Sequence, residues 1–196
     1  MRTPALRAEP LALLAIAAAA WALTAQRMSG MDQLGGVGWF AVSWLLMMAA
    51  MMLPSLVPAA LAVARGVPAF VAGYLAAWAV AGLAAYLVAD RMSHAVAVAV
   101  ILVAAAYQLT ATKTKCLERC RHPAVAGLRG GLRHGASCVG CCAGLMAALF
   151  ALGVMSLAWM AVVAALIAAE RVLPWRTPAV YGVAVTLALL AIVVAV

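Results

Sequence analysis

The five cysteines of the chain form two groups whose spacing is typical of a site for a soft metal ion. Cys116 and Cys120 enclose the segment CLERC, and Cys138, Cys141 and Cys142 follow in CVGCC. Thiolates are soft ligands, which select Cu(I), zinc or iron–sulfur clusters. One buried cysteine is usually a small packing residue, but two such groups in a short chain indicate metal binding or thiol redox chemistry.

Histidines and arginines flank the two cysteine groups. His122 follows CLERC and His134 precedes CVGCC, so an imidazole could complete a metal site. Arg129 and Arg133 lie between the groups, and nearby cations favour the thiolate, which is the form that binds metal. We expect the two groups to converge on one site if the segment between them folds back.

Four methionines form a second set of soft ligands, in two pairs that are four residues apart: Met47, Met48, Met51 and Met52. Residues four apart share one face of a helix. Methionine also fills irregular gaps in a core, so packing is the alternative interpretation. Thioethers bind Cu(I) but compete poorly for zinc, so the methionines favour Cu(I), with zinc as the alternative ion. The two prolines after them predict a kink, because proline removes a backbone donor.

The elements that must carry these ligands are membrane helices. The chain has 196 residues, of which 69% are hydrophobic and 9% charged, whereas a soluble domain is about half apolar and a quarter charged. Its charge-free runs are 10–26, 34–64, 66–89, 92–112, 135–169 and 177–196. A spanning helix needs about 20 apolar residues, which all runs but the first provide. We predict one integral membrane domain over residues 1–196, an all-α polytopic helix bundle with about six transmembrane helices.

Two of these runs have unusual lengths. Run 10–26 is short and follows Arg2 and Arg7, as the apolar part of a secretory signal would, but we interpret it as a retained helix. A helix from Cys138 to Glu170 would cover about 48 Å, against about 30 Å for the hydrocarbon core. We predict one tilted helix there, with Cys138 at one membrane face and Glu170 near the other.

Segment 113–136 is basic and rich in glycine, and it carries six of the thirteen Lys and Arg residues. The glycines of its later part, AVAGLRGGLRHGAS, predict a flexible loop. The excess of Lys and Arg predicts that this cysteine-containing loop is cytoplasmic, together with both termini. We therefore expect a multi-pass membrane protein whose thiols face a compartment that keeps them reduced. The net charge of +8 is then a topology signal, and we expect no nucleic acid as a partner.

Four segments in this order carry a family resemblance: MMAAMMLPSLVP, YQLTATKTKCLERCRHP, HGASCVGCCAGLM, and GVMSLAWM followed by Glu170. The chain resembles, over about residues 38 to 175, a bacterial family of predicted metal-binding integral membrane proteins. The resemblance implies a polytopic inner-membrane protein, and copper delivery to a cuproprotein is the role suggested for some members. Ala111 and Ser156 depart from the pattern, where the family is expected to carry proline and asparagine.

The sequence predicts a membrane protein that binds a soft metal ion, preferentially Cu(I), for delivery or transport. We do not expect an enzyme, and there is no nucleotide-binding motif for ATP-driven transport. One alternative is a membrane thiol–disulfide oxidoreductase that uses the vicinal Cys141 and Cys142, or Cys138 with Cys141. Uptake of a toxic soft metal such as Hg(II) is another, and an interaction scaffold with incidental cysteines is a third. The lipid bilayer and a metal-receiving cuproprotein are the expected partners, and the sequence leaves homo-oligomer formation open.

Overall fold

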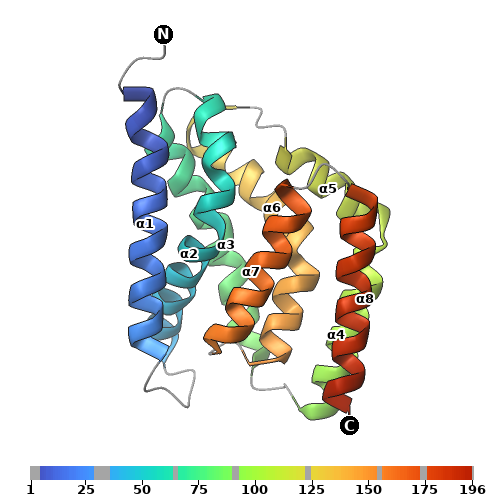
Figure 1. Cartoon of the computed structure of the whole chain (residues 1–196). Helices are drawn as coiled ribbons and strands as arrows, with labels where there is room; N and C mark the ends of the chain where they lie inside the picture. The colour runs from blue at the N-terminus through green and yellow to red at the C-terminus, as the bar shows by residue number, and fades with distance from the viewer. Residues whose placement is uncertain are drawn as a thin grey trace. The chain divides into compact units, whose positions relative to one another are not determined.

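The computed structural model describes residues 5–28, 36–63, 66–89, 93–121, 125–153, 156–172 and 176–195. Within those ranges the chain forms helices and no strand. The helices are α1 (Ala5–Met28), α2 (Val37–Val63), α3 (Val67–Ala89), α4 (His94–Gln108), α5 (Ala111–Arg121), α6 (Gly127–Ala151), α7 (Leu157–Val172) and α8 (Arg176–Ala195) (Figure 1). The prediction of an all-α fold is confirmed.

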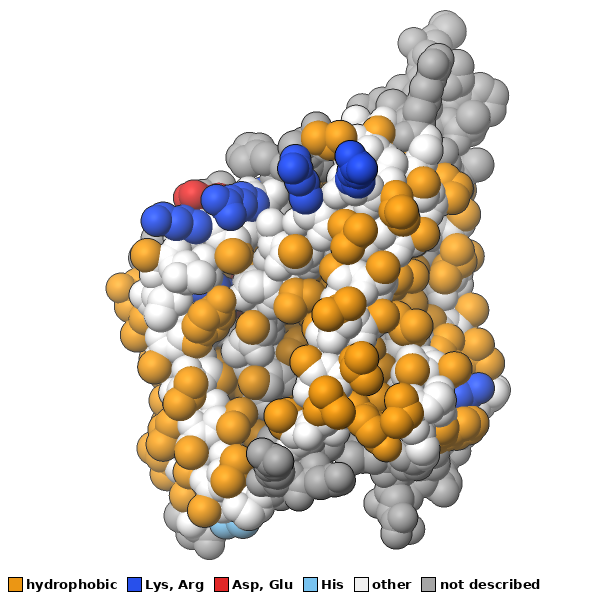
Figure 2. Space-filling model, turned by 180° about the vertical axis from the view of Figure 1, so that it is seen from behind, with side chains coloured by type: hydrophobic (Ala, Val, Ile, Leu, Met, Phe, Trp, Pro, Cys, Tyr) orange, Lys and Arg blue, Asp and Glu red, His pale blue; other side chains and the backbone are white. Residues whose placement is uncertain are grey.

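Most of the described helices are long and apolar enough to cross a membrane. The candidate spans are Pro10–Arg27 in α1, Val37–Val63 (α2), Val67–Val88 in α3, Gly127–Ala151 (α6) and Pro178–Ala195 in α8. These are five spans, or up to six if the bent pair of α4 and α5 forms one more. Figure 2 shows hydrophobic side chains over most of the visible face, as a lipid environment requires. The structure thus agrees with the predicted polytopic bundle of about six transmembrane helices.

The chain divides into two compact units, and helices α3, α5 and α6 each continue from one unit into the other. Unit 1 comprises Met1–Tyr86 and Arg119–Val139, and unit 2 comprises Leu87–Glu118 and Gly140–Val196. In unit 1, α1 packs along α2 (Figure 1). The indole Nε1 of Trp44 in α2 donates a buried hydrogen bond of 2.9 Å to the carbonyl of Trp78 in α3. This bond ties α2 to α3 and gives the buried indole N–H of Trp44 a partner that lipid would not supply.

Two glycines four residues apart bring α6 close to α3 in unit 1. A Cβ added at Gly135 would lie 2.7 Å from the Ala77 Cβ, and one added at Gly131 would meet the backbone of Phe70. Small residues at this spacing let two membrane helices approach closely. Because the glycines pack in this way, the segment is helical from Gly127 onward, which corrects the flexible loop that the sequence predicted up to residue 136.

In unit 2, α4 bends into α5, and α8 runs beside α4 in the opposite direction (Figure 1). The axes of α4 and α5 differ by 67°. Thr110 caps the start of α5, because its hydroxyl accepts a hydrogen bond of 3.4 Å from the backbone N–H of Lys113. Beyond this bend the chain stays helical to Arg121.

Helices α6 and α7 are separated by a short turn, so the single long helix that the sequence predicted over 138–170 is wrong. Gly153 follows α6 with a φ of 100°, in the left-handed region that favours glycine. Ser156 begins α7, and its hydroxyl accepts a hydrogen bond of 3.5 Å from the backbone N–H of Trp159. Helix α7 therefore runs back, and its last turn contacts Cys141 through Arg171. The prediction that this segment ends near the membrane face opposite the cysteines is therefore wrong.

Candidate metal centre

Helices α5 and α6 carry the five cysteines, and the structure brings three of their thiols together. Cys120 and Cys138 lie in unit 1, and Cys141 follows Cys138 along the uninterrupted helix α6. The sulfur atoms of Cys120, Cys138 and Cys141 all lie within 4.8 Å of one another. We call these three residues the thiol trio. One member comes from CLERC and two come from CVGCC, so the predicted convergence of the two groups is observed for these residues.

The thiol trio is shielded from solvent. Cys120 is 8% exposed, Cys138 0% and Cys141 2%. The hydroxyl of Tyr74 in α3 lies 3.0 Å from the Cys138 sulfur, within hydrogen-bonding distance. All five cysteines fall among the described residues, and none of them forms a disulfide. Buried, reduced sulfur atoms at such short separations are a donor set that suits a soft metal ion.

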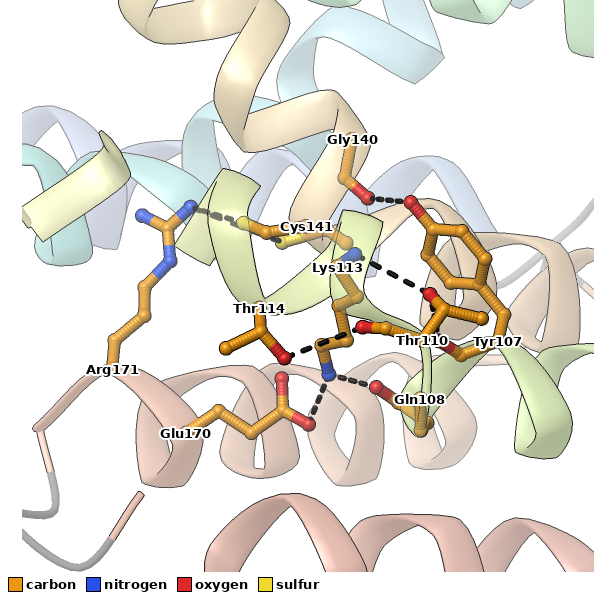
Figure 3. A network of polar contacts seen from close by, with 10 residues as sticks. Tyr107, Gln108, Thr110, Lys113, Thr114, Gly140, Cys141, Glu170 and Arg171 are labelled. Carbon is orange, nitrogen blue, oxygen red and sulfur yellow. Dashed lines mark hydrogen bonds and ion pairs between the residues drawn. The ribbon is translucent and has the colours of Figure 1, made fainter. Parts of the chain in front are cut away.

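Cys142 lies next to the thiol trio. Its sulfur is 3.6 Å from the sulfur of Cys141, and both residues are buried. The guanidinium Nη2 of Arg171 lies 3.6 Å from the Cys141 sulfur and 3.8 Å from the Cys142 sulfur (Figure 3). A positive charge from the end of α7 therefore faces the sulfur atoms of both vicinal cysteines.

Cys116 packs against the backbone of α6 in unit 2. A Cβ added at Gly140 would lie 2.8 Å from the Cys116 sulfur, so only glycine leaves room for this thiol. The carbonyl of Gly140 accepts a hydrogen bond of 2.7 Å from the Tyr107 hydroxyl (Figure 3). Cys116 is half-buried and lies outside the thiol trio, although it borders the residue that precedes Cys141.

A buried charged network lies in unit 2, and the sequence reasoning did not find it. The ammonium group of Lys113 donates to a carboxylate oxygen of Glu170 and to the side-chain carbonyl of Gln108 (Figure 3). Lys113 is 0% exposed and Glu170 is 2% exposed. Ionisable residues within membrane helices usually pair with one another and mark a functional site. A Glu at the end of a long apolar run was the available signal, but its partner depends on the turn between α6 and α7.

His134 is not a member of the thiol trio. The ring of His134 lies between two aromatic rings of α3, with centroids 5.6 Å from Phe70 and 5.9 Å from Tyr74. His134 is buried, and the group of sulfur atoms within ligand distance does not include its nitrogens. His122 lies outside the described residues. A ligand role for His134 stays a prediction.

The four methionines of α2 are all buried, as a packing role and a ligand role would both require. Helix α2 continues to Val63 through Pro54 and Pro58. The Ser55 hydroxyl donates a bond of 2.8 Å to the Met52 carbonyl, so this side chain has its partner within α2. The proposed ligand role of Met47, Met48, Met51 and Met52 stays a prediction.

Comparison with known proteins identifies one matching family. A family model described as PpoB2, copper chaperone, matches residues 41–194, which is most of the chain. No curated protein matches, and no solved structure matches. The match includes all five cysteines and the four methionines of α2, and it agrees with the resemblance that the sequence motifs indicated.

Proposed function

The chain belongs to the PpoB2 copper chaperone family, and from this premise we propose that it binds Cu(I) as cargo at the thiol trio and delivers it to a cuproprotein. Family membership and the cysteine group together support metal binding, with copper as the plausible ion. Delivery, the oxidation state and the receiving protein belong to the proposal. A chaperone that binds and releases its metal unchanged does not act as an enzyme.

The observation that carries the proposal is the close grouping of the sulfur atoms of Cys120, Cys138 and Cys141, all within 4.8 Å. Soft thiolates favour Cu(I), zinc and iron–sulfur clusters. Structural zinc sites almost always have about four protein ligands in a tetrahedron. Among the described residues the group within ligand distance consists of three sulfur atoms, which suits Cu(I) better than the four-ligand tetrahedron of structural zinc.

Transfer of the ion requires further ligands beside the binding site. Cys142 is 3.6 Å from Cys141 and can take over one bond to the metal as another is released. Cys116 borders the same turn of α6 and is more accessible. We include both thiols in the proposed transfer route. The methionines of α2 are proposed as weaker thioether ligands on that route, because thioethers bind Cu(I) without competing for zinc.

We propose that the protein lies in the bacterial inner membrane with its basic segment 113–133 in the cytoplasm, as the distribution of Lys and Arg favours. The turn at Gly153 changes the expected side of the C-terminus. Helix α7 runs back toward the cysteines, and α8 then runs antiparallel to α4 in unit 2. We therefore propose that the end of α8 faces the side opposite the basic segment.

A set of serine variants tests copper binding by the thiol trio. Cys120→Ser, Cys138→Ser and Cys141→Ser each remove one of the three donors, so each should lose stoichiometric Cu(I) while membrane insertion stays normal. Cys116→Ser removes a thiol outside the trio and is the matched control, which should keep its copper. The measurement is copper per protein, without oxygen and with a competing chelator. Full loading of all three trio variants would contradict the proposal.

The spacing of Cys141 and Cys142 supports thiol–disulfide exchange as a second candidate function, because their sulfur atoms are only 3.6 Å apart. An oxidoreductase of this kind would leave anaerobic purification free of metal and would show a reversible dithiol potential. A copper-loaded protein with no such potential would exclude this candidate.

A further inference from the structure

The guanidinium group of Arg171 lies beside sulfur atoms that the proposed function uses. Its Nη2 lies 3.6 Å from Cys141, a member of the thiol trio, and 3.8 Å from Cys142 (Figure 3). Arg171 follows Glu170 at the end of α7, and Glu170 forms its buried ion pair with Lys113 of α5. Lys113 thus supplies a separate cation for the carboxylate, while the guanidinium of Arg171 faces the thiols.

We propose that Arg171 is a specificity-determining residue that makes the site prefer monovalent soft ions, such as Cu(I), over divalent ones, such as Zn(II) or Hg(II). The inference rests on the proposed function and deepens it by naming the charge class of the cargo. A monovalent ion on a given set of thiolates leaves the complex one unit more negative than a divalent ion does. A fixed guanidinium beside those thiolates stabilises the more negative complex.

The size of this preference follows from Coulomb's law. When two ions compete for the same thiolates, the protonation of the empty site contributes equally to both and cancels from the ratio of their affinities. What remains is the repulsion between Arg171 and one extra positive charge on the metal. At the separation of a few ångströms that the sulfur contacts imply, in a partly buried site, this repulsion changes the ratio by about tenfold or more.

The buried Lys113–Glu170 pair helps to maintain the preference for monovalent ions. A carboxylate without its own cation beside Arg171 would offset the guanidinium charge and weaken the discrimination between the two classes of ion. Both members of the pair are almost completely buried, where charges are screened least. Lys113 and Glu170 are therefore positioning residues for the selectivity, and Arg171 is the group that contacts the thiols.

The test is a competition experiment on the full chain in lipid nanodiscs without oxygen. The affinities of Cu(I) and Zn(II) are measured against chelators, and Ag(I) and Cd(II) serve as a second pair of soft ions that differ by one charge. Arg171→Met and Arg171→Gln both remove the charge, and Gln preserves polarity if Met disturbs folding. Arg171→Lys keeps the charge. Lys115→Met removes an exposed cation from α5 and is the matched control.

We expect both neutral variants to lower the Cu(I)/Zn(II) and Ag(I)/Cd(II) affinity ratios by at least about tenfold. Arg171→Lys should restore most of each ratio, and Lys115→Met should leave both unchanged. Wild-type protein that binds Cu(I), with ratios that the neutral variants do not alter, would overturn this inference and leave the proposed function standing. Wild-type protein that binds no Cu(I) would overturn the proposed function and the inference together.

Discussion

Lys113 and Glu170 are 57 positions apart in the sequence and form a buried ion pair in the structure. The contact joins α5, which carries CLERC, to α7, whose next residue faces the vicinal thiols of CVGCC. The pair therefore joins the helix that carries CLERC to the helix whose arginine lies beside the thiols of CVGCC. Gln108 accepts a further hydrogen bond from Lys113, so the ammonium group is held from two directions.

Replacing one partner of this pair should lower the free energy of unfolding more than replacing both partners does. Lys113→Met or Glu170→Leu leaves one buried charge uncompensated, which we expect to lower the free energy of unfolding by about 3 kcal/mol or more. The double variant should recover most of that loss, because an apolar pair of similar volume fits the same space. Denaturant unfolding in mild detergent measures the three values. Additive losses in the double variant would show that the two side chains do not interact.

The glycine contact between α3 and α6 should control the position of Cys138. Gly135→Leu would force α6 away from Ala77 and Tyr74, and Tyr74 also holds the Cys138 sulfur. We expect a loss of about 1–3 kcal/mol in stability from overpacking, together with weaker copper binding. Gly182→Ala in α8, where an added Cβ meets nothing within 4 Å, is the control. Copper binding by Gly135→Leu that matches the control would argue against the contact as the element that positions the site.

The methionines of α2 should affect transfer more than stability. The paired replacement Met51→Leu and Met52→Leu keeps apolar volume, and each such exchange usually costs less than about 1.5 kcal/mol. We expect normal insertion and melting but slower passage of copper to an acceptor chelator. A transfer rate equal to that of the wild type would assign the methionines to packing alone.

Reporter fusions should place segment 113–133 and the C-terminal end of α8 on different sides of the membrane. We expect a cytoplasmic signal from a fusion in segment 113–133 and a periplasmic signal from one after Val196, since α7 runs back before α8 begins. Cytoplasmic signals from both positions would instead support the topology that the distribution of charge in the sequence predicted.

The sequence was sufficient to predict helices that are long and apolar enough to span a membrane, and the grouping of thiols from both cysteine segments. Long charge-free runs require helices, because lipid offers no partner for an exposed backbone. Cysteines in two short groups indicate metal binding or thiol redox chemistry. The convergence of Cys120 with Cys138 and Cys141 followed from α5 and α6 being adjacent along the chain.

The predictions that failed depend on packing between distant segments. The glycines before Cys138 suggested a loop because glycine is flexible alone, but two of them fit against α3 and stabilise a helix. Gly153 and Ser156 are local signals for the turn between α6 and α7. The apolar residues around them favoured one continuous helix instead. Once that turn was missed, neither the partner of Glu170 nor the position of Arg171 could be predicted.

Copper K-edge X-ray absorption on the anaerobically loaded full chain tests the central claim most directly, because it reports the atoms bound to the metal. The account predicts Cu(I) with a shell of sulfur alone, supplied by Cys120, Cys138 and Cys141, and the same spectrum for Cys116→Ser. A shell of nitrogen or oxygen ligands, or a spectrum that Cys138→Ser does not change, would contradict the assignment of the thiol trio as the copper site.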